Sequence, residues 1–217
     1  MVVCLAVLPG CRREKPLPKE VAEAPPEVRE PVRKALEAGK VEVPPAIREL
    51  AQPAPGVEDD GIALLSPVST FVASAAPTFR WQRDERSQAY QVRIWDAEGK
   101  PAATSPWTDK DEWKCETELA PGGKYEWQVA GKGKRAERLS SKASFHVPAA
   151  GVLKRLEEAR RSLSGNEMAL AVVYAREGAV DEAQRLLASY IVKNPTSEEA
   201  KKLYKSLRAQ RVELTKK

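Results

Sequence analysis

The chain has a single histidine, His146, and only three cysteines among its 217 residues. Histidine and cysteine clusters hold most structural and catalytic zinc ions, and a histidine serves the nucleophile in the common acyl-transfer triads. One histidine therefore excludes a histidine-rich metal site and argues against triad chemistry. We expect no metal, no cofactor and no catalytic residue.

Signatures of phosphate and nucleic-acid binding are missing as well. Gly131 and Gly133 lack the lysine-serine ending that would follow the strand of a phosphate-binding loop. The 36 lysines and arginines exceed the 31 acids by only five, and the two signs are interspersed rather than gathered in a basic stripe. The sequence predicts a non-catalytic chain without a nucleic-acid partner. A deep cleft lined by converging ionisable groups would overturn the prediction that the chain does not catalyse.

The N-terminus, residues 1–11, is an apolar run that stops at a cysteine followed by charged residues. Leu8, Pro9, Gly10 and Cys11 fill the positions of the small-residue box that precedes a lipidated cysteine. The segment resembles the end of a bacterial lipoprotein signal peptide, which implies lipidation of Cys11 and attachment to a bilayer facing the periplasm or the exterior. An unprocessed apolar N-terminus with an incidental cysteine is the alternative.

Residues 12–60 hold nine of the 17 prolines and no aromatic residue. A segment of this composition cannot build a core of its own and favours extended, semi-rigid spacing. Val28, Val32 and Leu36 recur at helical spacing before Gly39, and Pro45 can open a second helical turn. We expect a proline-rich linker with two short helices, whose small apolar faces dock on a later domain rather than on a separate partner.

All five tryptophans and all three phenylalanines lie in residues 61–147. Short segments here alternate apolar and polar residues and are separated by turn residues every ten or so positions. One example runs through Tyr90, Val92 and Ile94, and another through Tyr125, Trp127 and Val129. This period-two alternation predicts strands with one buried face, as a two-sheet sandwich requires.

The run from Leu119 through Tyr125 to Trp127 resembles the entry to the next-to-last strand of a fibronectin type III domain. In that family a tyrosine corner ties the loop to the strand. Trp81 matches the buried tryptophan of the second strand. The resemblance implies a fibronectin III-like or immunoglobulin-like β-sandwich used for binding or spacing rather than for catalysis.

Trp107 and Trp113 fall outside the clearest inward alternation. Aromatic rings presented on a sandwich can stack on sugars or anchor a protein partner. They can equally cover the edge of the sandwich or a seam with a neighbouring module. Carbohydrate binding by these two rings is the weaker of our alternatives for the function.

Residues 149–213 are rich in alanine, leucine and charged residues and predict four helices, at about 149–163, 166–177, 181–193 and 197–213. The middle pair resembles a tetratricopeptide repeat (TPR) of about 34 residues, with apolar or small residues at the expected offsets before a final proline. These positions are Leu170, Ala171, Tyr174, Gly178, Ala183, Leu187 and Pro195. The resemblance implies a small helical bundle that receives a peptide in its concave face.

The expected fold is thus multidomain, a β-sandwich followed by a TPR-like helical bundle, with a proline-rich N-terminal linker. The function that these features favour is a non-catalytic, envelope-anchored interaction or adaptor lipoprotein, with a protein or peptide partner at the helical module and a bilayer at the N-terminus. The alternative is a cytoplasmic regulatory or sensor fragment of a longer signalling protein.

Overall fold

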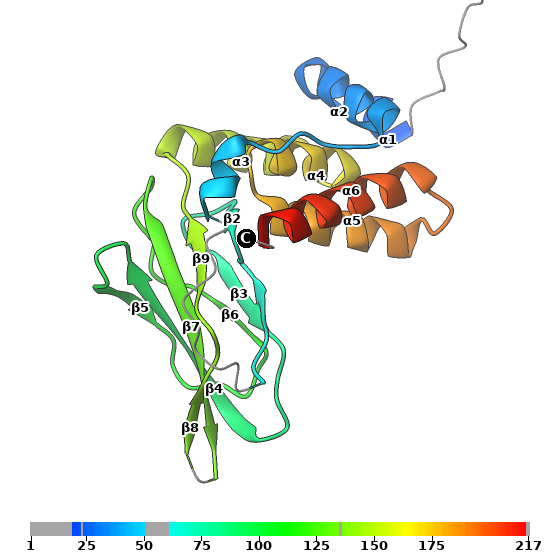
Figure 1. Ribbon diagram of the computed structural model, residues 1–217. Coiled ribbons are helices and arrows are strands. Elements are labelled where there is room, and N and C mark those ends of the chain that lie inside the picture. Colours follow the sequence, from blue (N-terminus) through cyan, green and yellow to red (C-terminus); the bar gives the residue numbers. More distant parts are fainter. Residues whose placement is uncertain (1–18, 23, 51–60, 135, 216–217) are drawn as a thin grey trace, which may run out of the picture.

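The computed structural model describes residues 19–22, 24–50, 61–134 and 136–215. A β-sandwich and a helical module follow one another along the chain, and two N-terminal helices lie on the side of the helical module away from the sandwich (Figure 1). The expected lipidation segment, with Cys11, lies outside the described residues.

The sandwich consists of a three-stranded and a six-stranded sheet. The first has the order β1-β3-β6 and the second β2-β9-β7-β4-β5, with β8 paired to β7. Strand β2 runs parallel to β9, and the other named strand pairs are antiparallel. The strands are β1 Leu64–Ser66, β2 Thr70–Phe71, β3 Thr78–Trp81, β4 Ser87–Asp96, β5 Pro101–Thr104, β6 Glu112–Lys114, β7 Lys124–Gly133, β8 Glu137–Leu139 and β9 Ala143–His146.

Aromatic side chains fill the space between the two sheets. The ring of Phe79 lies 4.9 Å from that of Trp127 and 5.4 Å from that of Phe145, measured between centroids. Trp127 is fully buried and donates its indole N–H to the carbonyl of Pro67 at 2.7 Å. Trp81 is also buried, against Tyr90. The predicted alternation therefore places its apolar faces inward, and the β-sandwich prediction is confirmed.

The turn before β7 is closed by Tyr125. Its hydroxyl donates to the carbonyl of Ala120 at 3.3 Å, the kind of hydrogen bond that a tyrosine corner makes. Leu119 is buried beside it. A Cβ on Gly123 would stand only 2.6 Å from the Tyr125 ring, so glycine leaves the room that the ring occupies.

The helical module contains α3 Ala150–Ser162, α4 Glu167–Arg176, α5 Val180–Lys193 and α6 Glu198–Thr215. Asn166 caps α4 by accepting the amide of Ala169 at 3.1 Å, and the hydroxyl of Ser197 accepts the amide of Ala200 at the start of α6. The helices begin and end within about two residues of their predicted limits because caps and glycines mark these ends in the sequence.

The N-terminal segment departs from the linker that its composition predicts. It forms α1 Lys19–Ala22, α2 Pro26–Ala38 and the 3₁₀ helix η1 Pro45–Leu50. Val32, Val41 and Ile47 are almost fully buried. The described part of residues 12–60 is therefore packed structure rather than a solvated spacer. A few apolar residues at helical spacing are enough to fold this segment into packed helices, because the helical module supplies the other half of the core.

Candidate functional site

Helix α2 occupies one face of the helical module. It packs on α4 and α6, and its buried Val32 and Ala35 join the same hydrophobic cluster as Leu170 and Leu203. We call this face of α4 and α6 the α2 groove. After α2 the chain stays attached, because Gln210 donates its side-chain amide to the carbonyl of Val41 at 3.0 Å. Figure 1 shows α2 on the opposite side of α4 and α6 from the sandwich.

Most of the residues that carry the TPR resemblance lie in the core of the helical module. The side chains that are buried together in the helical core are those of Leu170, Ala171, Tyr174, Ala183 and Leu187. Pro195 lies exposed in the turn between α5 and α6. The helix pair thus lies where the resemblance predicts it, and membership of the TPR family stays a prediction.

Gly178, in the turn between α4 and α5, connects the helical module to the sandwich. Its carbonyl accepts the amide of Phe71 at 3.0 Å and the hydroxyl of Thr70 at 3.1 Å. The same hydroxyl accepts the amide of Val180 at 3.0 Å. Gly178 has a φ of 89°, and a Cβ on it would stand 2.8 Å from the Phe71 ring. The turn needs glycine both for its backbone conformation and for the close approach of β2.

A buried carboxylate also lies at this junction. Asp181, at the start of α5, accepts the amide of Val68 at 2.8 Å and pairs with the Arg211 guanidinium at 3.1 Å. Arg211 also donates to the carbonyl of Leu65 at 3.1 Å. Burial raises the pKa of Asp181 to about 6, although Arg211 and the Val68 amide act in the opposite direction. One side chain from α5 and one from α6 therefore hold the chain around β1 and β2.

Glu182 lies beside Asp181 and is only partly satisfied. One carboxylate oxygen accepts the amide of Ala73 at 3.3 Å, whereas the other, Oε2, is buried without a hydrogen-bond partner among the described residues. Burial, and then the negative charge of Asp181, raise the pKa of Glu182 to about 7. A carboxyl group with this pKa is partly protonated at neutral pH.

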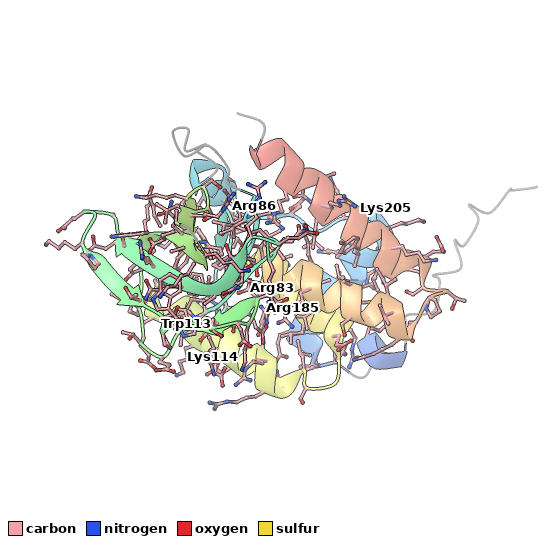
Figure 2. All side chains as sticks on the ribbon, turned by 90° about the horizontal axis from the view of Figure 1, so that it is seen from below. Arg83, Arg86, Trp113, Lys114, Arg185 and Lys205 are labelled. Carbon is pink, nitrogen blue, oxygen red and sulfur yellow. The ribbon has the colours of Figure 1, made fainter. Side chains whose placement is uncertain are left out.

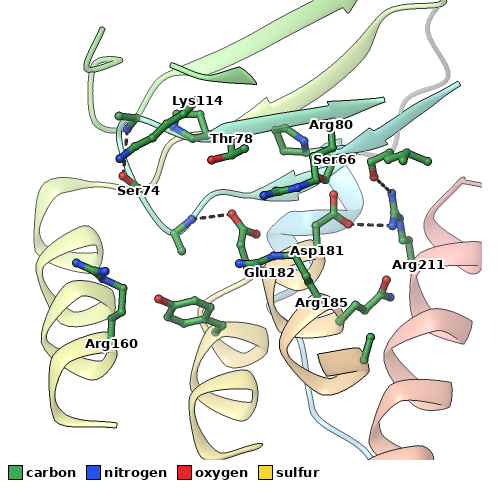
Figure 3. A pocket seen from close by; sticks show the side chains of 18 of the residues that line it. Ser66, Ser74, Thr78, Arg80, Lys114, Arg160, Asp181, Glu182, Arg185 and Arg211 are labelled. Atoms are coloured by element: carbon green, nitrogen blue, oxygen red, sulfur yellow. Dashed lines mark hydrogen bonds and ion pairs between the residues drawn. The ribbon is translucent and has the colours of Figure 1, made fainter. Parts of the chain in front are cut away.

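A cleft of about 470 Å³ lies between the sandwich and the helical module. We call it the interdomain cleft. Figure 3 shows Asp181, Glu182 and Arg185 on its helical wall and Lys114 and Arg80 on its sandwich wall. Figure 2, turned by 90° from Figure 1, shows Lys114 beside Trp113 on the sandwich.

Some of the ionisable groups that line the cleft are held in ion pairs. Arg160 pairs with Glu157 at 2.9 Å, and Arg80 with Glu112 at 3.1 Å. No serine or cysteine of the lining shares a hydrogen bond with an acid in the part of the chain that the structure describes. Ionisable groups do converge in this cleft, so the absence of catalysis stays a prediction.

The two tryptophans that sequence analysis singled out lie in different settings. Trp113 stacks on Phe79 at 5.8 Å between ring centroids and is only partly exposed. Trp107 is 39% exposed, and the Lys132 ammonium lies 5.8 Å from the centre of its ring. Within the described ranges no ring contact joins the two side chains. They do not form a shared aromatic platform.

The residues with reactive side chains have structural roles. Cys115 is buried, its thiol donates to the carbonyl of Thr117 at 3.2 Å, and burial raises its pKa. His146 is bonded to the carbonyl of Gly122 at 2.9 Å, so that its Nε2 carries the proton, and its ring packs against Phe71. Within residues 19–22, 24–50, 61–134 and 136–215 no cluster of histidine, cysteine or acidic residues has the geometry of a metal site.

Helices of the described part of the chain lack the length and apolar character needed to span a bilayer. No protein-family model and no curated protein matches the sequence.

Several solved structures resemble part of the chain. One is a fibronectin III-like protein from Clostridium thermocellum, with 19% identity and a TM-score of 0.33 over 41% of this chain and 96% of that one. A second, described as a myokine structure, has 12% identity and a TM-score of 0.32 over 45% of this chain and 99% of that one. A third is the third fibronectin III domain of a human protein, with 14% identity and a TM-score of 0.32 over 46% of this chain and 87% of that one.

Sequence analysis missed the polar residues of the junction. Asp181 and Glu182 stand in the first turn of α5, where acidic side chains interact favourably with the helix dipole. This common role accounts for the two acids without any contact to the sandwich, so the sequence alone does not predict that contact. The available signal was weak: two adjacent acids at a helix start, three residues after the glycine of a turn.

Proposed function

We propose that the chain is a non-catalytic, envelope-anchored interaction protein whose helical module binds an amphipathic helix of a partner protein. The observation that supports this most directly is α2. It places an amphipathic helix against α4 and α6, so the α2 groove has the shape and apolar surface to hold such a helix. Helix-in-groove recognition works through apolar side chains at helical spacing.

The chemistry of α2 describes the partner that fits this groove. Val28, Val32, Ala35 and Leu36 form its inward stripe, and Arg33 makes ion pairs with Glu30 and Glu37 on the same helix. A partner helix in the same place needs three or four small or branched apolar residues on one face. Charges on its other face stay in water and contribute little to affinity.

In this proposal α2 and the partner compete for one groove. The segment after α2 stays tied down through Val41 and the buried Ile47, so displaced α2 remains close to its groove. A tethered competitor of this kind acts at a high effective concentration. Partner binding is then weak until α2 is weakened or drawn away.

Anchoring forms the second part of the proposal. Lipidated Cys11 would hold the chain at a membrane surface, since each buried methylene contributes about 0.8 kcal/mol. The test is metabolic labelling with palmitate in a bacterial host, followed by fractionation. We expect the label in the membrane fraction and its loss in Cys11→Ser. Unlabelled soluble protein would exclude anchoring and favour the cytoplasmic alternative.

The groove is tested with the full chain and a labelled synthetic peptide that has the sequence of residues 24–40. Val32→Asp places a charge at a fully buried position of α2 and should release the helix. We expect the peptide to bind this variant about tenfold more tightly than the parent chain, because the competitor is gone. Lys34→Asp, on the exposed face, is the matched control and should bind as weakly as the parent.

Tryptophan fluorescence checks that the sandwich of Val32→Asp is folded, and circular dichroism checks the helices. If the helices are lost, Val32→Ala provides a milder release of the same contact. Equal peptide binding by parent and a folded variant would contradict the proposal.

A further inference from the structure

We infer that the interdomain cleft is a second binding site, which takes an acidic peptide segment. The carboxylates of the segment pair with Lys114 and Arg185, and its backbone is held by Glu182 and Gln184. This site is separate from the α2 groove, and the inference does not depend on the function proposed above.

The cleft is preorganised for a ligand because both of its walls are fixed relative to each other. Gly178 and Asp181 join the helical module to the chain around β2 through several hydrogen bonds, and Arg211 reaches the carbonyl of Leu65 from α6. A ligand therefore need not order the two modules with respect to each other, which preserves its binding free energy. The volume of about 470 Å³ lies within the range of ordinary ligand sites.

The charge of the lining favours an anionic ligand. Five basic side chains line the cleft, namely Arg80, Lys114, Arg160, Arg185 and Arg211, against three acidic ones, Glu157, Asp181 and Glu182. Arg80, Arg160 and Arg211 each have an acidic partner. In the described part of the chain Lys114 and Arg185 form no ion pair, and they stand on opposite walls (Figure 3). The charge of Arg185 acts on Glu182 and lowers the pKa of that carboxyl group, although burial outweighs this effect.

Buried polar atoms favour a peptide over a simple anion. Oε2 of Glu182 and Nε2 of Gln184 are both buried, and neither has a hydrogen-bond partner among the described residues. A buried polar atom that lacks a partner is unfavourable, so a ligand that satisfies it, once the side chain turns toward the cleft, gains in affinity. A peptide group presents both an N–H for Glu182 and a carbonyl for Gln184.

Glu182 does not oppose an anionic ligand strongly. Its burial raises its pKa to about 7, so this carboxyl group is partly neutral near neutral pH. Asp181 is already neutralised by Arg211. The net charge that a ligand meets in the cleft is therefore positive.

The experiment uses the full chain and three probes: a fluorescein-labelled hexapeptide of alternating glycine and glutamate, the same peptide with glutamine in place of glutamate, and glutarate as a competitor without peptide groups. We expect saturable binding of the glutamate peptide by fluorescence anisotropy. The glutamine peptide should bind at least about tenfold more weakly, because charge-assisted hydrogen bonds are lost. Glutarate should compete poorly.

The variants locate the site. Lys114→Gln combined with Arg185→Gln should weaken binding of the glutamate peptide about tenfold or more, and Gln184→Leu about fivefold. Lys124→Gln combined with Lys154→Gln removes two cations outside the cleft and is the matched control, which should bind within about twofold of the parent at the same ionic strength. Melting temperatures verify that all variants are folded.

Four results would overturn the inference: no saturable binding, equal affinity for the two peptides, no loss in the Lys114 and Arg185 double variant, or competition by glutarate as strong as that of the unlabelled glutamate peptide. The last result would identify a simple carboxylate site instead of a peptide site. The α2 variant Val32→Asp should leave binding of the glutamate peptide unchanged, so failure of the groove proposal and failure of this inference are distinguishable.

Discussion

The sandwich and the helical module fill their interiors with different kinds of residue. Large rings meet between the two sheets, where Phe79 contacts Trp113, Trp127 and Phe145. Alanine is the most frequent residue of the helical core, where Ala171, Ala175 and Ala183 are fully buried and let the backbones of neighbouring helices approach closely. Removing volume should therefore damage the first module most, and adding volume the second.

The two modules also differ in how far they close on themselves. The buried core of the sandwich comes from residues 62–147. The core of the helical module includes Val21, Val32 and Val41 from the N-terminal segment. Helices α4 and α6 carry an apolar face on the side away from the sandwich. Here α2 covers it, so the helical module needs a part of the chain that precedes the sandwich.

The largest effect is expected from Phe79→Ala, which empties the centre of the sandwich. The lost burial and the remaining cavity should lower the free energy of unfolding by about 3–5 kcal/mol. Tryptophan fluorescence in a denaturant titration measures it, because all five tryptophans belong to the sandwich. Leu65→Ala, at a position that is 48% exposed, is the control. A loss below about 1 kcal/mol for Phe79→Ala would argue against a core centred on this ring.

The second prediction adds volume to the core of the helical module, and its expected effect is smaller. Ala183→Trp inserts a large ring where α4 and α5 cross and should cost about 1–3 kcal/mol. Circular dichroism at helical wavelengths, followed through thermal unfolding, measures the change. Val192→Trp adds the same ring at a position that is 82% exposed and should leave the melting temperature nearly unchanged. Similar melting temperatures for both variants would contradict the tight crossing.

The junction between the modules should make stability depend on pH. The folded pKa of Glu182 is about 7, above its ordinary value of 4.5, so the folded chain holds a proton that the unfolded chain has lost between these pH values. The stability contribution is complete below about pH 4.5 and is lost as pH rises to about 7. Asp181, with a pKa of about 6, acts in the same direction.

Glu182→Gln should remove part of this loss. Because Glu182 interacts with Asp181, part of the shift belongs to the pair, and we expect a gain of about 1–2 kcal/mol at pH 8 relative to pH 5, less than the full pKa difference would give. The measurement is the difference in unfolding free energy between variant and parent at both pH values. Glu158→Gln, on the surface of α3, should show no such difference. A variant less stable than the parent at pH 8 would contradict this role for Glu182.

The smallest effect concerns the corner of the sandwich. Tyr125→Phe removes the hydroxyl that donates to Ala120 and should cost about 1 kcal/mol. Fluorescence-detected unfolding is again the measurement. Tyr204→Phe in α6 serves as the control, since no hydrogen bond of the Tyr204 hydroxyl is present among the described residues. Equal stability of Tyr125→Phe and the parent would show that the Tyr125 hydrogen bond contributes nothing to the free energy of unfolding, while the sandwich fold itself would stand.

Local patterns in the sequence were sufficient for the longer elements but not for short ones such as α1, β2, β5 and β8. Alternation through Tyr90 and Val92 placed β4, and glycine and capping residues placed the ends of α4 and α6. The docking of short apolar faces was also predictable for α2, because Val28, Val32 and Leu36 share one side of a helix. The extent of that packing was not, since composition suggested a solvated linker.

The junction and the cleft could not be predicted because they depend on contacts between distant parts of the chain. Asp181 meets the amide of Val68 across 113 positions of sequence, and Glu182 meets that of Ala73 across 109. Nothing in the local pattern at the start of α5 distinguishes an acid that faces water from one that faces another module. The same holds for Lys114 and Arg185, which only the relative placement of sheet and helix brings to one cleft.

The contacts between the helical module and the sandwich have a consequence for how the two sequences can diverge. Asp181, Glu182, Arg211 and the carbonyl of Gly178 bind main-chain groups of the sandwich, with the Thr70 hydroxyl as the side-chain exception. Main-chain groups are the same whatever residue carries them. Over evolutionary time, these contacts should therefore place no constraint on the side chains at residues 65, 68 and 73 of homologous chains beyond their packing, whereas the glycine, the two acids and the arginine that bind them should change together or not at all.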